Sequence, residues 1–207
     1  MINWLTLTAF IPTFFLVSIT PGLCMTMAMS LGLSIGVKRA LWMMAGELLG
    51  VAIVATASAV GVATIMLQFP LLFLLFKIAG GLYLIFLGYE LWLSKGRLAL
   101  HNTEIGALSV DRKALAWQGF ITAIANPKGW AFFIALLPPF ISPDHSVAIQ
   151  LPILILIILV LEFICLLIYA AGGKTVRVLL QSRQNVKLIN RLAGTLMVGV
   201  GIWLMAS

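Results

Sequence analysis

The sequence predicts an all-α, polytopic membrane protein with six transmembrane helices, and three observations lead to this fold class. First, hydrophobic residues make up 62% of the 207 residues and charged residues only 9%, whereas a soluble domain carries roughly 25% charged residues. Second, the apolar runs reach the ~20 residues that a helix needs to cross a bilayer. Third, basic residues gather in the short loops between these runs. This composition excludes an ordinary soluble enzyme, a disordered protein and a coiled coil.

The six apolar segments follow one another with short connections and form a single transmembrane domain over residues 1–207. The first three segments make up one half of the chain, 1–94, and the last three make up the other half, 114–207. A cytoplasmic loop at 95–113 is expected to join the two halves. The expected spans are 5–34, 41–67, 70–93, 114–140, 147–171 and 188–206.

Lys and Arg residues occupy every second loop. They lie after the first, third and fifth segments, whereas the chain ends and the other two loops hold none. By the positive-inside rule the basic loops are cytoplasmic, so both termini are expected to face outward. The alternative is that the net charge of +7 reflects binding to nucleic acid or anionic lipid, but the strict alternation favours topology. The basic loop residues are Lys38, Arg39, Lys95, Arg97, Arg112, Lys113, Lys174, Arg177, Arg183 and Lys187, with Arg191 at the boundary of the last loop.

Two features recur in both halves of the chain. The string Lys77–Leu82 in the third segment matches Arg191–Leu196 in the sixth: a base, a branched aliphatic residue, Ala-Gly, a small residue and Leu. The first and fourth segments each carry a polar residue followed by proline near the middle, Thr20-Pro21 and Asn126-Pro127. Because each half has three helices, the second half enters from the opposite side, which predicts a 3+3 inverted-topology repeat of the kind found in secondary transporters. The alternative is a chance similarity between apolar sequences.

The two proline segments, helices 1 and 4, are expected to be broken helices that bind a substrate. Proline removes an N–H donor and clashes with the carbonyl one turn back, and Thr20 and Asn126 are available as caps. In lipid the freed backbone groups must find partners or line a wet cavity, and the N-terminus of a half-helix favours an anion such as a carboxylate. The alternative is a kinked helix whose unpaired backbone groups form hydrogen bonds with neighbouring helices. The expected substrate-binding residues are Thr20, Pro21, Gly22, Asn126, Pro127 and Lys128.

Three ionisable residues, Lys128, Glu47 and Glu162, are expected well inside the membrane. An intramembrane charge is costly, and such groups are usually paired or functional. Either carboxyl group could pair with Lys128, and a carboxyl group in apolar surroundings is also suited to carry a proton. We therefore expect Glu162 and Glu47 to couple transport to protons, with a purely structural pairing to Lys128 as the alternative.

The cysteines and histidines do not predict a metal site or an enzyme. Cys24 and Cys165 lie in apolar runs and have no Cys or His at metal-ligand spacing, so a zinc site or a loop disulfide is not expected. His101 and His145 both fall in loops. No cluster of Asp, His or Cys has the spacing of a catalytic centre, and no cofactor is expected.

Several of these motifs resemble those of the LysE/RhtB superfamily of amino-acid exporters, which includes threonine, lysine and leucine efflux proteins. The Asn-Pro-Lys element at 126–128, followed by two phenylalanines, is the most specific of them. The chain departs from the family pattern at Leu23-Cys24, where the family often has proline and a polar residue, and at Glu47, where Asp is usual. The resemblance rests on Thr20-Pro21-Gly22, Gly46-Glu47-Leu48, Lys77-x-x-Gly80-x-x-Tyr83-Leu84, Asn126-Pro127-Lys128, and Glu162 with Tyr169.

The resemblance implies an exporter of amino acids or related small zwitterionic metabolites, driven by proton antiport with alternating access, in a bacterial inner membrane. Its expected partners are an amino-acid-like substrate, protons and the lipid bilayer; no nucleic acid is expected, and a homo-oligomer is left open. One alternative is a transmembrane thiol–disulfide carrier that uses Cys24 and Cys165, since relatives of this superfamily include such proteins. That chemistry needs a cysteine near both prolines, and the fourth segment has none. A channel is a further alternative, which flux that does not saturate with substrate would indicate.

Overall fold

The computed structural model describes residues 4–68, 70–93, 111–141, 146–173, 178 and 182–206, and these residues are nearly all helical. The predicted all-α class is confirmed. Of the expected loop at 95–113, residues up to 110 lie outside the described part, and Arg112 and Lys113 already belong to a helix. The elements in chain order are α1 (Trp4–Ile19), α2 (Leu23–Ser34), α3 (Val37–Gln68), α4 (Pro70–Leu93), α5 (Arg112–Ile124), α6 (Pro127–Leu136), the 3-10 turn η1 (Pro138–Phe140), α7 (Val147–Ala171) and α9 (Arg183–Ala206).

Two of the described helices are each long and apolar enough to cross a membrane. They are α3, over Val37–Gly61, and α7, over Val147–Ala171. The pair α1 and α2 passes the same test as one bent span, with an angle of 60° between Phe10–Ile19 and Leu23–Ser34. The chain is therefore an integral membrane protein by the length and composition of its helices, and the full set of six spans stays a prediction.

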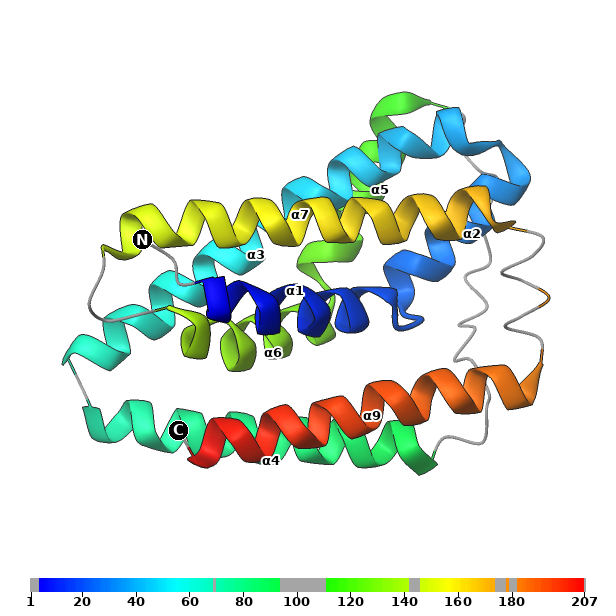
Figure 1. The fold of residues 1–207 in the computed structure, drawn as a ribbon. Coiled ribbons are helices and arrows are strands. Elements are labelled where there is room, and N and C mark those ends of the chain that lie inside the picture. Colours follow the sequence, from blue (N-terminus) through cyan, green and yellow to red (C-terminus); the bar gives the residue numbers. More distant parts are fainter. Residues whose placement is uncertain are drawn as a thin grey trace.

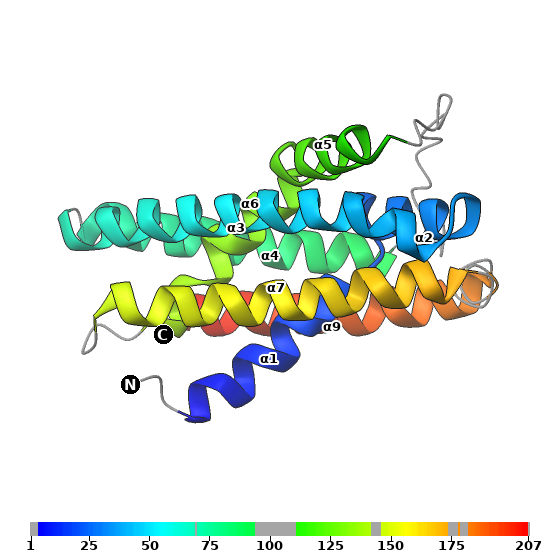
Figure 2. The same ribbon diagram turned by 90° about the horizontal axis from the view of Figure 1, so that it is seen from above.

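The helices turn at two opposite ends of the bundle (Figures 1 and 2). The start of α1, the turn from α3 to α4 and the end of α9 lie at one end. The turn from α2 into α3 and the first residues of α5 and α9 lie at the other end. Gly36 makes the turn into α3 with a φ of +83°, a left-handed conformation that glycine adopts without a steric penalty. The helix ends next to the basic loops therefore share one end of the bundle.

The helices pack in three sets. α3 lies along α5 and α6, α7 lies along α1 and α2, and α4 pairs with α9 at one side of the bundle (Figure 1). Small residues allow the closest approaches. A Cβ atom on Gly46 would overlap the backbone of Ala116, and one on Gly88 would lie 2.6 Å from the carbonyl oxygen of Gly194. The helices at these two crossings therefore tolerate no side chain larger than hydrogen.

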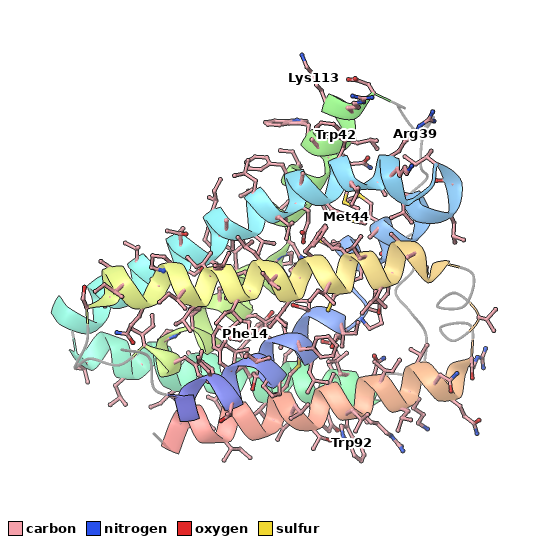
Figure 3. All side chains as sticks on the ribbon, turned by 45° about the horizontal axis from the view of Figure 1, so that its top comes forward. Phe14, Arg39, Trp42, Met44, Trp92 and Lys113 are labelled. Atoms are coloured by element: carbon pink, nitrogen blue, oxygen red, sulfur yellow. The ribbon has the colours of Figure 1, made fainter. Side chains whose placement is uncertain are left out.

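An aromatic cluster fills the interior between α1, α6 and η1. The rings of Phe10 and Phe14 lie 4.3 Å apart, and Phe140 packs edge-on against Phe10 at 5.0 Å. Phe14 also stacks on Phe133 of α6 at 6.3 Å, and Figure 3 shows Phe14 in the middle of the bundle. Large apolar side chains also cover the outer faces, as at Leu71, which is 73% exposed. In a membrane protein such faces meet lipid rather than water.

Candidate functional site

The two helix breaks lie next to each other and border an interior cavity of about 60 Å³. The break between α1 and α2 contributes Thr20 and Gly22, and the break between α5 and α6 contributes Asn126. Lys128 of α6, Glu47 of α3 and Glu162 of α7 supply its charged groups. Most of the remaining wall is apolar: Phe14, Val51, Val54, Phe132 and Phe133.

The first break follows from the loss of backbone hydrogen bonds at Pro21. Proline has no N–H, so the carbonyl of Val17 one turn back loses its helical partner. The ammonium of Lys128 replaces that partner, donating to the carbonyl of Val17 at 3.2 Å and to that of Thr20 at 3.3 Å. The hydroxyl of Tyr169 on α7 donates to the carbonyl of Ile19 at 2.9 Å. Side chains from α6 and α7 thus donate hydrogen bonds to the backbone carbonyls at the end of α1.

At the second break, residues close to it in the sequence form hydrogen bonds with the free backbone groups. Asn126 is the N-cap of α6, and its side-chain oxygen accepts the backbone N–H of Lys128 at 3.1 Å. Pro127 occupies the first turn of α6, where its missing N–H costs no hydrogen bond. The indole of Trp130 donates to the carbonyl of Ile124 at 2.8 Å. The amide of Asn126 also contacts the sulfur of Cys24 at 3.8 Å, which links the second break to α2.

Lys128 connects the two breaks. Its ammonium lies over the ring of Phe132, 5.6 Å from the centroid, and a Cβ atom on Gly22 would be 3.7 Å from it. The carbonyls that it binds lie at the C-terminal end of α1, where the helix dipole favours a cation. Glu162 interacts with it electrostatically, but in the described part of the chain no carboxylate forms a direct ion pair with it. The ammonium of Lys128 therefore binds backbone oxygens, and an anionic ligand could compete with these oxygens for it.

Glu47 and Glu162 face each other across the cavity from α3 and α7. Glu47 is fully buried, and neither of its carboxyl oxygens has a hydrogen-bond partner among the described residues. The thiol of Cys24 lies beside Glu47, and the hydroxyl of Ser18 lies beside Glu162. A buried carboxyl group without a hydrogen-bond partner is costly, so Glu47 is suited to bind a cationic or hydrogen-bond-donating group of a ligand.

The structure thus brings most of the predicted site residues together. Pro21 and Pro127 do not line the cavity; they act by ending α1 and by starting α6. Thr20 does not cap α2, because its hydroxyl donates back to the carbonyl of Leu16 at 2.6 Å, and Gly22 is the N-cap residue without a side-chain bond. The predicted residues that line the cavity are Thr20, Gly22, Asn126, Lys128, Glu47 and Glu162.

Sequence reasoning missed three contributions to the site. Phe14, Val17 and Ser18 line the cavity from one face of α1, a grouping that their i, i+3, i+4 spacing on a helix could have indicated. Tyr169 belongs to the family resemblance, but its hydrogen bond to the carbonyl of Ile19 is a contact across the fold that residue spacing does not indicate. Cys24 also borders the cavity, a position that its chemistry as a thiol does not indicate.

The structure gives the two cysteines no common role. Both are buried and free, and Cys24 borders the cavity whereas Cys165 does not. A thiol–disulfide carrier is therefore unsupported. Within the described residues, no group of three or more His, Cys, Asp or Glu side chains is arranged to hold a metal ion.

Similarity to known proteins extends over nearly the whole chain. The family model described as LysE type translocator matches residues 15–207. The homoserine/homoserine lactone efflux protein of Salmonella typhimurium is 28% identical over 193 residues, covering 93% of this chain and 92% of that protein. The leucine efflux protein of Klebsiella pneumoniae is 25% identical over 183 residues, covering 87% and 85%. No solved structure matches the chain.

Proposed function

Because this chain belongs to the LysE type translocator family, we propose that it exports amino acids or related small zwitterionic metabolites across a bacterial inner membrane by proton antiport. The observation that carries the proposal is the meeting of two broken helices at a cavity that holds one ammonium and two carboxyl groups. Groups of both signs suit a zwitterion, because its carboxylate and its ammonium each find an opposite charge. Binding and movement, rather than a chemical reaction, are what this arrangement serves.

The proposed architecture is a 3+3 inverted repeat of six spans, over residues 1–94 and 114–207. The packing supports it: α3 of the first half lies on the broken pair α5 and α6 of the second, and α7 of the second half lies on the broken pair α1 and α2 of the first. The pairing of α4 with α9 is its own counterpart under such symmetry. Matching broken segments in the two halves are the usual position of a transporter's binding site.

We propose that the end of the bundle with the basic loops is cytoplasmic and that both termini lie outside. The positive-inside rule supports this orientation, since the basic residues adjoin helix ends at one end of the bundle only. Export then means that substrate enters the cavity from the end where α3 and α5 begin and leaves at the end where α3 meets α4. Alternating access follows if the two halves rock around the cavity.

The substrate carboxylate is proposed to bind Lys128 and the start of α2. The N-cap residue of α2 is Gly22, so no side chain caps the first backbone N–H groups of this helix, and such groups favour an anion. The ammonium of the substrate is proposed to bind Glu47 or Glu162. The apolar remainder of the wall favours a neutral side chain, as in the homoserine and leucine that relatives are named for. A carboxylate on Lys128 would compete with the carbonyls of Val17 and Thr20 and so loosen the end of α1.

Proton coupling is proposed to use the same carboxyl groups. Because like charges repel, ionisation of one of two carboxyl groups that face each other disfavours ionisation of the other, and a cation bound at the pair relieves this repulsion. The substrate ammonium is such a cation, and its departure to the outside leaves the pair ready to take up a proton there. Proton return through Glu162 or Glu47 would then reset the transporter.

The test is efflux from proteoliposomes loaded with a mixture of amino acids that includes homoserine and leucine, with and without an imposed pH gradient. We expect selective loss of neutral amino acids, faster when the outside is acidic. Protein-free liposomes are the control for leakage. Folded protein that releases no amino acid under either condition would refute the proposal, and flux that never saturates would indicate a channel.

A further inference from the structure

A second cavity, of about 340 Å³, lies at the end of the bundle where α3 and α5 begin. Its walls come from two elements that are far apart in the sequence. Lys38, Arg39 and Trp42 belong to the first turns of α3, and Arg112 and Leu115 belong to the first turn of α5. Three of these five side chains are cations. Figure 3 shows Arg39 and Trp42 together at this end of the helix pair.

One of the three cations, Arg112, lies over an aromatic ring of the same cavity. The guanidinium of Arg112 lies over the ring of Trp42, 5.6 Å from its centroid. Such a contact fixes the guanidinium while leaving its N–H donors free to point outward. Leu115 below it is buried, whereas Trp42 is 44% exposed. Asp111, the acidic neighbour of Arg112, is the N-cap of α5, and its carboxylate accepts the N–H of Ala114 at 3.3 Å.

The backbone of α3 and α5 makes the electrostatic potential in the cavity more positive. Both helices begin at the same end of the bundle, so the positive ends of two helix dipoles lie beside the cavity. The side chains of Lys38, Arg39 and Arg112 stand at these two N-termini, where they do not offset the dipoles but reinforce them. A site with this sum of charges is suited to an anion with several oxygens, since planar guanidinium groups pair well with phosphate.

An apolar surface leads away from this cavity along the same two helices. On α3, Trp42 is followed at helical spacing by Leu49, 59% exposed, and Ile53, 44% exposed. On α5, the matching outer face carries Trp117, 64% exposed, and Ile121, 45% exposed. A free phosphate would use only the charged cavity. A molecule with an anionic head and long apolar chains would use both parts.

We propose that the cavity formed by Lys38, Arg39, Trp42, Arg112 and Leu115 binds the phosphodiester headgroup of an anionic phospholipid, whose acyl chains lie on the outer faces of α3 and α5. Basic pockets between transmembrane helices on the cytoplasmic side are suited to such headgroups. The site is separate from the central cavity, so it holds whether or not the chain exports amino acids. A lipid bound in this cavity would contact the first turns of both α3 and α5 and so stabilise their packing against each other.

The test uses the full chain in detergent and three probes: phosphatidylglycerol, phosphatidylcholine and inorganic phosphate. Native mass spectrometry measures bound lipid, and the midpoint of thermal unfolding measures stabilisation. The variants are Arg112→Gln and the double variant Lys38→Gln/Arg39→Gln, whose exposed positions leave the core unchanged. The matched control is Lys113→Gln, which removes the same charge from an exposed side chain that does not line the cavity.

We expect phosphatidylglycerol to bind and stabilise the wild type, and its affinity to fall about fivefold for each cation removed from the cavity. Lys113→Gln should stay within twofold of the wild type. Equal losses in Arg112→Gln and Lys113→Gln would overturn the site in favour of diffuse surface attraction. Equal stabilisation by inorganic phosphate would overturn the lipid as ligand, and equal binding of phosphatidylcholine would overturn headgroup recognition. If Arg112→Gln does not fold, the double variant decides among the same outcomes.

Discussion

Both helix breaks have the same sequence motif, a polar residue followed by proline. The backbone groups that become free at the two breaks find their hydrogen-bond partners in different parts of the chain. At the second break, Asn126 caps α6 and Trp130 reaches the last turn of α5. At the first break, Lys128 of α6 and Tyr169 of α7 supply the donors for the end of α1. The second break therefore holds itself together, whereas the first is held by the other half of the chain.

This difference indicates which break responds when the halves move. Rocking of one half against the other would leave intact the bond from the N–H of Lys128 to the side-chain oxygen of Asn126 and the bond from Trp130 to Ile124, because both partners of each bond move together. The same motion would stretch the bonds from Lys128 and Tyr169 to the end of α1. In the proposed mechanism, the first break is thus the place where substrate binding, through Lys128, is coupled to movement of the two halves.

The largest effect is expected from removing the donor that spans the two breaks. Lys128→Ala should abolish export, because both the proposed carboxylate partner and the bonds to Val17 and Thr20 are lost. Lys128→Met keeps most of the side-chain volume and should abolish export equally. Efflux from proteoliposomes measures the loss, and Lys113→Ala is the control for removal of a lysine. Membrane insertion is checked separately, and wild-type export by Lys128→Met would refute a role for the ammonium.

The next largest effect concerns the carboxyl groups that flank the first break. Glu162→Gln should reduce export to near background and remove its response to an imposed pH gradient, because an amide cannot carry the proton. Glu47→Gln should have the same effect if the pair works as a unit, and a smaller one if Glu162 alone carries the proton. Glu90→Gln, an exposed carboxylate on α4, is the matched control. An unchanged pH response in both site variants would exclude the pair as the proton carrier.

The sequence was sufficient to find both breaks and the three charges, because their chemistry is local. An interior proline removes a backbone hydrogen bond and kinks or breaks a helix, and an Asn before it can cap the next helix. Pro12 and Pro152 stay inside helices, so the polar residue before Pro21 and Pro127 is part of the signal. A charge inside an apolar run is costly and indicates a partner or a function. Each expected span overlaps a described helix or a run of consecutive helices, and among the described residues α3, α7 and the bent pair α1 and α2 are long and apolar enough to cross a membrane. Residue spacing could not reveal that Lys128 binds carbonyls of α1, since the two lie more than a hundred residues apart. The same holds for Tyr169, and for Thr20, whose hydroxyl bonds back within its own helix.

A smaller effect on export is expected from variants that remove one hydrogen bond at either break, and it should differ between the two breaks. Tyr169→Phe and Trp130→Phe each remove one donor and leave a backbone carbonyl unpaired, at a cost of about 1–3 kcal/mol. We expect similar decreases in the free energy of unfolding, measured by chemical denaturation in detergent. Export should decrease only in Tyr169→Phe, because its bond joins the two halves whereas that of Trp130 lies within one. Equal export by the two variants would contradict the distinction between the breaks.

The smallest effect is expected at the contact that links the breaks through sulfur. The amide of Asn126 approaches the sulfur of Cys24 at 3.8 Å, and a thiol is a weak acceptor, so the link contributes little. Cys24→Ser/Cys165→Ser should therefore keep nearly all export, with serine donating and accepting at the same position. Transport of homoserine and leucine by the double variant measures this directly. Loss of all export in folded double variant would mean that the thiols take part in the function, and it would return the thiol carrier to consideration.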